Sequence, residues 1–320
     1  MTQKTLLQIV QTAQGELGLA QSASVVGNID QTTVQMYGYA NQSLEELRQV
    51  KDDGWTALQK EYNLVVNVPV ATTGNTTANN AVITNIPSTA ALLANYMMVA
   101  GANIPAAARI LSVDSATQVT MTMECTTTAV GIALTFMQDT YPEPSDFGYF
   151  INRTWWDRTN RWELLGPDSP QMDQWHRSGI VVTGPRRHFR QLGALANTYR
   201  IWPPPAEITA PLQLVYEYVS QDCVYVNGGT TTAPTFANDA DIPILSDRAI
   251  ILAVKWRFWE QKGFDWTQKR TDYDDYVERL IARDGGRKTL SLVKRQSPIF
   301  ISPSNVQDGF FPGPTGPNMS

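Results

Sequence analysis

The sequence predicts an α+β protein in which segments from both ends of the chain form a helical bundle beside a β-rich middle region. Apolar residues recur at helical spacing near the amino terminus and again after residue 246. Between these segments, several stretches alternate apolar and polar residues, as half-buried strands do. The chain has 320 residues, 42% hydrophobic and 17% charged, which is enough to bury a sizeable core and suggests about two domains.

Composition excludes several classes of protein. Nine Trp, twelve Tyr and ten Phe argue against wholesale disorder, and the net charge of −5 argues against a strong overall grip on DNA. The two cysteines, Cys125 and Cys223, have neither disulfide-framework nor zinc-finger spacing. No stretch reads as a signal peptide or a membrane span. We therefore expect a chain that is made in the cytoplasm and does not bind membranes.

The amino-terminal region predicts two helices followed by a strand. Asp30 is a suitable N-cap for the second helix, and residues 52–54 (Asp-Asp-Gly) should stop it. Residues 61–68 then alternate as a strand. The first helix should bury one side, which carries Leu6, Leu7, Ile9, Val10 and Ala13.

Residues 67–139 differ from the rest of the chain. They hold no Trp and are rich in Thr, Ala and Asn. Alternation over 108–113, 118–123 and 132–137 predicts a small all-β module inserted into the host fold, although a long disordered loop is the alternative. The only charged residues of this region are Arg109, Asp114, Glu124 and Asp139.

The rest of the chain contains an aromatic β region, two helices and a tail. Strands are predicted over 180–183, 199–202 and 212–219. Ser246 or Asp247 should cap a buried helix, and a second helix should end before Gly285. The predicted domains are therefore 1–66 with 140–295 as the core, 67–139 as the module and 296–320 as an extended carboxy-terminal arm. Within the arm, prolines forbid a helix, while Phe300, Phe310 and Phe311 could anchor it to a partner.

Motifs that carry chemistry are scarce. His176 and His188 belong to no zinc-protease pattern, and no nucleophile elbow, P-loop or dinucleotide fingerprint occurs. The sequence therefore predicts no catalytic residue, no cofactor and no metal ligand. Residues 184–190 form a basic run that could touch phosphates, although a salt-bridged edge is the commoner explanation. Five tryptophans between 155 and 202 indicate a core or a subunit contact, the contact candidates being Trp155, Trp156 and Trp175.

Four passages resemble the head-to-tail adaptor proteins of short-tailed bacteriophages. They are the amino-terminal helix pair, residues 141–159 (from Tyr-Pro-Glu-Pro to Trp-Trp-Asp-Arg-Thr), residues 199–220 (beginning Tyr-Arg-Ile-Trp-Pro-Pro-Pro) and residues 256–273 (from Trp-Arg-Phe-Trp to Asp-Tyr). Their order and spacing together carry the resemblance. The β module also resembles one found in phage virion proteins, but the plainest adaptor proteins lack it.

The resemblance implies a structural virion protein at the head–tail junction. Such proteins form a ring, usually of twelve copies, beneath the portal ring. DNA passes through the lumen without sequence recognition, and a tail nozzle or tail fibres attach below. The resemblance also implies that the carboxy-terminal arm reaches the portal.

Two other functions remain open at the level of sequence. The β module together with Trp155 and Trp156 could bind a carbohydrate or a receptor. Alternatively, Asp274 and Glu278, which would share one face of a helix, could act as the paired carboxylates of a cell-wall hydrolase. A solvated acidic helix face is the commoner explanation for that pair.

Overall fold

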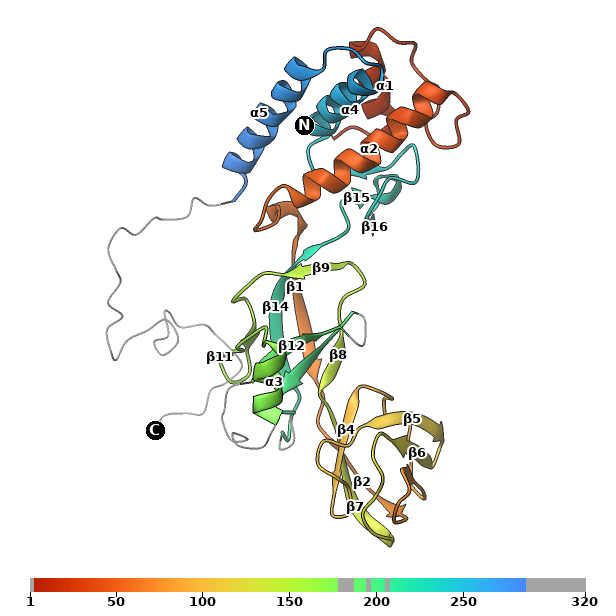
Figure 1. The fold of residues 1–320 in the computed structure, drawn as a ribbon, viewed down its shortest axis with the longest axis vertical. Coiled ribbons are helices and arrows are strands. Elements are labelled where there is room, and N and C mark those ends of the chain that lie inside the picture. The colour runs from red at the N-terminus through yellow and green to blue at the C-terminus, as the bar shows by residue number, and fades with distance from the viewer. Residues whose placement is uncertain (1–2, 178–186, 194–196, 205–207, 286–320) are drawn as a thin grey trace, which may run out of the picture.

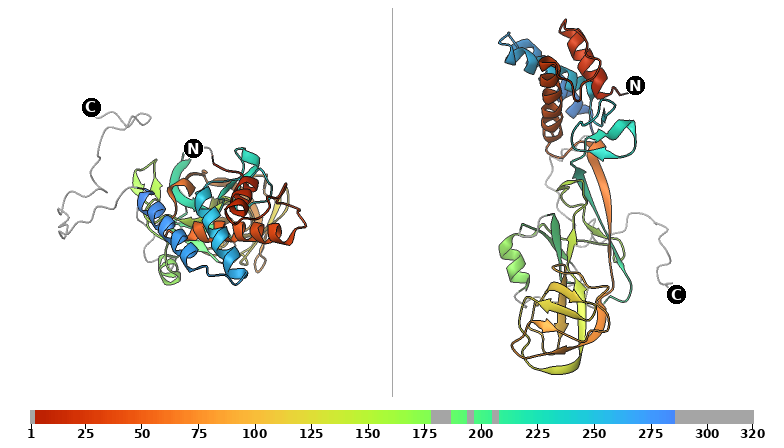
Figure 2. Two further views of the ribbon diagram at one scale, coloured as in Figure 1. Left: turned by 90° about the horizontal axis from the view of Figure 1, so that it is seen from above. Right: turned by 90° about the vertical axis from the view of Figure 1, so that its right-hand side faces the viewer.

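The computed structural model describes residues 3–177, 187–193, 197–204 and 208–285. The fold is mixed α+β, with 28% helix and 30% strand. Four of the five described helices lie at one end of an elongated molecule, whereas the fifth, Pro170–Arg177, lies beside the β-sheets in the middle (Figure 1; Figure 2, right). Further small β-sheets form the other end (Figure 1). The described residues bury three hydrophobic cores along this length.

The first core lies among four helices from the two ends of the chain. α4 is the central helix, and it packs against α1, α2 and α5. Its residues are buried on nearly every side, as its sequence predicted. The one buried cation on α4, Arg257, donates to Ser43 and to the Glu46 carboxylate of α2. The helices are α1 (Leu6–Glu16), α2 (Gln31–Gln49), α4 (Asp247–Gln261) and α5 (Thr267–Arg283).

The helix starts follow local capping chemistry. The Asp30 carboxylate accepts the Thr33 backbone N–H at 2.9 Å, and the Ser246 hydroxyl caps α4, so both predicted caps are confirmed. Thr5 caps α1 through a capping box with Gln8. Gly18, with φ +72°, follows the end of α1 in the left-handed conformation that glycine tolerates best.

The second core lies within two sheets. In one, β14 pairs with β1, β9 and β10, and β10 pairs with β11. In the other, the strand order is β12-β13-β8. The strands are β1 (Gln59–Val66), β8 (Thr140–Pro142), β9 (Phe147–Phe150), β10 (Trp156–Asp157), β11 (Trp162–Glu163), β12 (His188–Leu192), β13 (Thr198–Trp202) and β14 (Leu212–Ser220).

Residues Val70–Gln138 form two further three-stranded sheets, with orders β2-β7-β4 and β3-β6-β5, around the third core. These residues form strands, as the predicted alternation of apolar and polar residues requires. The alternative of a long disordered loop is therefore wrong. The strands are β2 (Val70–Thr76), β3 (Val82–Ile83), β4 (Met97–Gly101), β5 (Ile110–Ser115), β6 (Gln118–Met121) and β7 (Ala129–Gln138).

A last small sheet, of order β16-β15-β17, contributes Val224 to the helical core. Its strands are β15 (Val224–Tyr225), β16 (Thr232–Ala233) and β17 (Ile242–Pro243), and short 3₁₀ turns occur at Thr56–Leu58 and Val226–Gly228. The predicted strand at 180–183 and the predicted arm at 296–320 lie outside the described residues. The sequence did not predict the short helix α3 (Pro170–Arg177), although Ser169 followed by Pro170 is a typical helix start.

Asp146 ties β1 to β14 beside the helical core. Its carboxylate accepts Lys60 Nζ at 2.6 Å and the hydroxyls of Tyr218 and Ser220 at 2.8 Å each. Burial alone would raise the pKa of this carboxyl, but these hydrogen bonds outweigh burial and hold the pKa below its usual value.

This cluster predicts an acid-sensitive component of stability. A depressed carboxyl pKa stabilises the fold above the pKa of the unfolded chain, near 3.9, and this contribution is lost as pH falls through the folded pKa. We expect Asp146→Asn to lower the free energy of unfolding at pH 7 and to weaken its decline between pH 5 and pH 2. Urea titrations at a series of pH values would measure both effects. Equal slopes in Asp146→Asn and in the exposed control Asp272→Asn would contradict this account.

Candidate functional site

The most elaborate polar site of the described residues is built around α3, which lies against β12 and β13. Ser169 begins the helix by accepting the Met172 backbone N–H. Asp173 and His176, one turn apart, are 3% and 7% exposed, whereas Met172 and Trp175 on the same helix are 46% and 45% exposed. One face of α3 is therefore polar but buried, and the other presents large apolar side chains to solvent.

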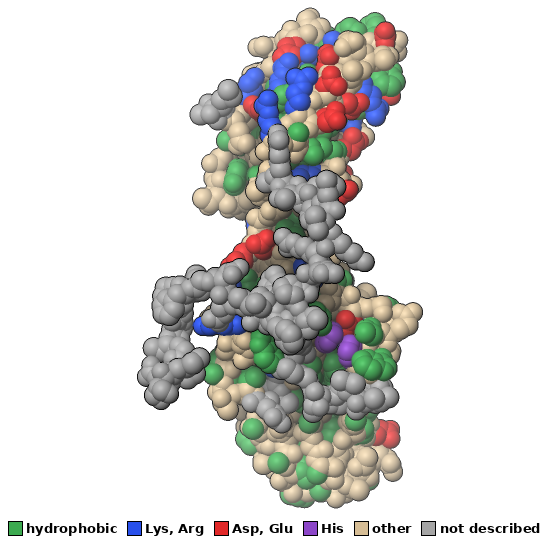
Figure 3. Space-filling view, turned by 90° about the vertical axis from the view of Figure 1, so that its left-hand side faces the viewer, with side chains coloured by type: hydrophobic (Ala, Val, Ile, Leu, Met, Phe, Trp, Pro, Cys, Tyr) green, Lys and Arg blue, Asp and Glu red, His purple; other side chains and the backbone are tan. Residues whose placement is uncertain are grey.

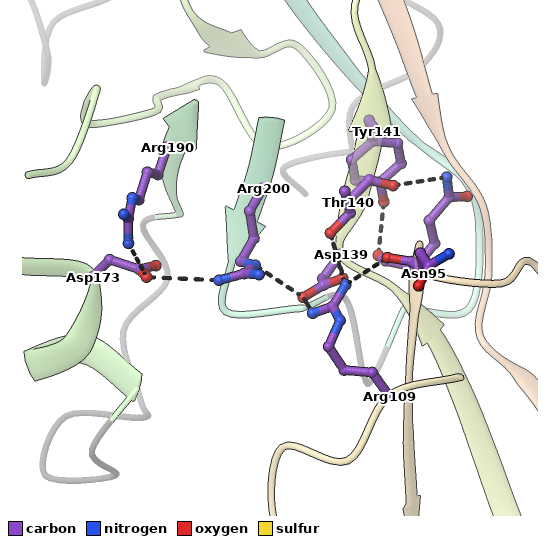
Figure 4. Close-up of polar contacts among 9 residues, drawn as sticks. Asn95, Arg109, Asp139, Thr140, Tyr141, Asp173, Arg190 and Arg200 are labelled. Carbon is purple, nitrogen blue, oxygen red and sulfur yellow. Dashed lines mark hydrogen bonds and ion pairs between the residues drawn. The ribbon is translucent and has the colours of Figure 1, made fainter. Parts of the chain in front are cut away.

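A ladder of alternating charges runs from α3 into the small β sheets (Figure 4). Asp173 accepts Arg190 at 2.6 Å and lies 3.6 Å from Arg200. Arg200 also lies 3.5 Å from the carboxylate of Asp139. Arg109 completes the ladder by donating from both of its terminal nitrogens to Asp139, at 2.6 and 2.7 Å. Each carboxylate of the ladder therefore lies between two guanidinium groups.

Asp139 is completely buried at the point where the chain leaves β7 and enters β8. Arg109 reaches it from the chain beside β5 and also donates to Thr140 Oγ1 and to the Asn95 carbonyl. The fork of two parallel N–H···O bonds is the strongest ion-pair geometry that side chains form. Arg109 and Asp139, two of the four charged residues in 67–139, therefore pair with each other in one buried ion pair.

Asp168, His176 and His188 form a second polar cluster beside the ladder. Asp168 Oδ1 lies 3.4 Å from His188 Nδ1, and Asp168 Oδ2 lies 3.7 Å from His176 Nε2. The two imidazole centroids are 4.2 Å apart. The cluster reaches the surface beside hydrophobic side chains, where the only two histidines of the chain are both visible (Figure 3).

Backbone bonds bring the Asp168 loop against β12. Leu165 and His188 form a parallel bridge, and the Asp168 N–H donates to the Phe189 carbonyl at 2.9 Å. Gly166, with φ +149°, makes this close approach possible, because a Cβ there would lie 2.5 Å from the Phe189 carbonyl oxygen. No pattern in the sequence predicts this pairing, because it depends on contacts between segments about twenty residues apart.

Trp155 is at the centre of the aromatic core. Its ring stacks on Phe189 at 4.2 Å and on Tyr216 at 4.0 Å. It has no exposed surface, so its proposed part in a subunit contact is wrong, and it cannot form a sugar-binding platform with its neighbour. Trp156 and Trp175 are 37% and 45% exposed and remain contact candidates.

The other candidate residues have plainer environments. In the basic run 184–190, Arg187 pairs with Asp157 at 3.5 Å and Arg190 pairs with Asp173, which favours the salt-bridged edge. Asp274 pairs with Arg270 on the exposed face of α5, and Glu278 is exposed on the same helix. Phe300, Phe310 and Phe311 lie outside the described residues.

The cysteines are poor nucleophiles. Both are free and buried. Burial raises the pKa of the Cys223 thiol to about 12 and also raises the pKa of Cys125. At neutral pH both therefore stay protonated, and neither is poised for attack on a substrate.

Comparisons with known proteins assign the chain to no family. No protein-family model matches the sequence, and no curated protein matches it significantly. Within the described residues, no helix is long and apolar enough to cross a membrane.

The buried ion pair predicts a large effect from an isosteric change. We expect Asp139→Asn to lower the free energy of unfolding by about 3 kcal/mol, because Arg109 and Arg200 lose the carboxylate that compensates them. The same carboxylate-to-amide change at exposed Glu124 should cost less than about 0.5 kcal/mol. Urea unfolding at pH 7 measures the loss of unfolding free energy in each variant. Similar losses in the two variants would show that the Asp139 ion pair does not stabilise the fold.

The neighbouring tryptophans provide a matched test of core against surface. Trp155→Ala should destabilise the chain by about 4 kcal/mol, since it removes a stacked ring from a packed core. Trp156→Ala should cost about 1 kcal/mol or less, because much of this ring is already in water. Thermal unfolding of the isolated chain compares them, and the account of the aromatic core fails if the order is reversed.

Proposed function

We propose that this chain is a structural subunit of a head-to-tail adaptor ring in a short-tailed bacteriophage, and that it is not an enzyme. The observation that supports this best is the arrangement of three separate cores along one elongated chain (Figures 1 and 2). A subunit of this shape can meet one partner with its helices and another with its β end.

The helical end would be the portal-facing part of the adaptor core. Its helices come from residues 6–49 and 247–283, so both ends of the chain join in one bundle. α5 packs on α4 and is the last described helix. An arm formed by 296–320 would follow this helix in the sequence, and we propose that Phe300, Phe310 and Phe311 anchor it on the portal.

Residues 67–139 fit an inserted module. The module begins and ends with neighbouring strands, because Val70 on β2 lies opposite Phe136 on β7. A segment whose ends meet can be added to a host fold without separating the strands on either side. The module stands at the far end from the helices, where tail nozzle or tail fibre proteins would attach (Figure 1).

Ring formation needs complementary surfaces on the two sides of each subunit. Large apolar side chains are exposed in several places on the described surface. Ile29 is 99% exposed in the loop before α2, and Phe264 is 59% exposed between α4 and α5. Together with Trp156 and Trp175, these side chains are the candidates for contacts between subunits.

The charge of the chain suits a DNA passage. Binding to the phosphate backbone depends on positive charge, and a channel that binds strongly would hinder ejection. The net charge of −5 and the ion-paired state of Arg187 and Arg190 favour passage of the genome without sequence recognition.

Native mass spectrometry of the purified chain, alone and with the portal ring of the same phage, tests the proposal. We expect a monomer that adds to the portal as one discrete ring, about twelve copies in size. A stable ring without portal would require a different assembly order. A monomer that ignores the portal would contradict the adaptor function.

Three further measurements separate the adaptor function from its alternatives. Removal of residues 297–320 should abolish attachment to the portal but leave the unfolding of the isolated chain unchanged. Glycan binding that disappears when residues 69–138 are removed would favour a receptor-binding protein instead. Clearing of cell-wall substrate that is lost in Glu278→Gln would favour a hydrolase.

A further inference from the structure

We propose that Asp168, His176 and His188 together bind one divalent transition-metal ion, for which Zn²⁺ is the best fit. The site is independent of the adaptor function. It joins α3 to β12, two elements that meet through side chains rather than through a shared sheet.

The spacing of the three groups suits a metal ion. Each residue offers one ligand atom, and these atoms all lie within 4.8 Å of one another. The two measured separations from the Asp168 carboxylate are 3.4 and 3.7 Å. Ligands at about 2.0–2.2 Å from a tetrahedral Zn²⁺ are about 3.3–3.6 Å apart, so small side-chain movements would complete the coordination.

His176 supplies an independent indication. Its Nε2 atom is buried and has no hydrogen-bond partner among the described residues, and the residue as a whole is 7% exposed. Buried polar atoms are nearly always satisfied, and an orphaned ring nitrogen is costly. This atom is on the side of the ring that approaches Asp168. A metal ion between the two groups would give it the partner that it lacks.

An ion pair alone explains the cluster less well. Charge-assisted hydrogen bonds between histidine and carboxylate are about 2.7–2.9 Å long. Both separations here exceed that length, and one carboxylate lies between two imidazoles. The contact between Asp168 and His188 is a long hydrogen bond, and the contact between Asp168 and His176 is longer still, so the three groups leave room for an ion among them.

The surrounding structure holds the ligands in place. Asp173 on α3 is bound by Arg190 and approached by Arg200, which fixes the helix one turn before His176. The Asp168 N–H is bound to the Phe189 carbonyl, next to His188. These contacts position the helix that carries His176 and the loop that carries Asp168.

The donor set selects the metal. Two imidazoles and one carboxylate suit Zn²⁺ and related first-row ions, whereas Mg²⁺ and Ca²⁺ prefer oxygen alone. Cys125 and Cys223 belong to two other cores, so a thiolate ligand is not expected. Three protein ligands would leave one position for water. The ion would cross-link α3 to β12 and so fix the exposed face that carries Met172 and Trp175.

The experiment uses the untagged full chain. The chain is first treated with a chelator, and the chelator is then removed. Isothermal titration with Zn²⁺ should give one equivalent per chain, and bound Zn²⁺ should raise the melting temperature. His176→Gln and His188→Gln should each weaken Zn²⁺ affinity at least tenfold, as should Asp168→Asn. The exposed control Asp114→Asn should bind Zn²⁺ as the parent chain does.

Folding and binding are separated by two readouts. In chelator, the histidine variants should melt within a few degrees of the parent chain, because the parent then also lacks the ion. Zinc-edge X-ray absorption on the parent chain should show nitrogen and oxygen ligands, with scattering from two imidazoles and no sulfur, and this result does not depend on any variant. The proposal is overturned if the chain binds less than about a tenth of an equivalent, if both histidine variants retain full affinity, or if the absorption spectrum shows sulfur.

Discussion

The buried carboxylate of Asp139 links the small β sheets to β13 and, through Arg200, to α3. It has no exposed surface, and a buried charge without compensation would be strongly destabilising. Its partners come from two directions: Arg109 from the small β sheets and Arg200 from β13. Because both must reach one carboxylate, the sheets of Val70–Gln138 are held in one orientation against the aromatic core. A hydrophobic contact in the same place would tolerate sliding, whereas a forked ion pair does not.

The same ladder extends to α3. Arg200 lies between Asp139 and Asp173, and Asp173 is buried on the face of α3 that also carries His176. The position of the histidine cluster therefore depends on charges that begin in the small β sheets. The exposed face of α3, with Met172 and Trp175, is oriented by the same contacts. In an adaptor subunit, this arrangement would relate the tail-facing end of the chain to a candidate contact surface on its side.

Much of the fold could be predicted from sequence because it rests on local rules. Asp30 and Ser246 cap helices because their side-chain oxygens accept backbone N–H groups of the first helical turn. β13 ends at Trp202 because three prolines follow it. The alternation of apolar and polar residues within 108–137 is a local pattern, and these residues form β5, β6 and β7. Boundaries differ where tertiary pairing sets them. The strand predicted over 61–68 is β1 over Gln59–Val66, because its pairing with β14 begins at Gln59 and ends at Val66.

The site could not be predicted in the same way. Asp168, His176 and His188 lie on a loop, a helix and a strand, and long-range contacts bring them together: the pairing of Leu165 with His188 and the ion pair of Asp173 with Arg190. Trp155 and Trp156 are adjacent and chemically identical in sequence, yet one is in the core and the other is exposed. Which neighbour points inward is set by the register of β10 on β14, where Trp156 lies opposite Val215. The ladder likewise needs residues from 109 to 200 in one place, and no spacing in the sequence indicates that.

Cryo-electron microscopy of the virion that carries this chain tests the central claim most directly. The account predicts a closed ring of this chain between the portal and the tail, with helices α1, α2, α4 and α5 toward the portal and the sheets of Val70–Gln138 toward the tail proteins. The lumen should be wide enough for duplex DNA. Density for the chain at the distal tail tip, or its absence from the particle, would contradict the account.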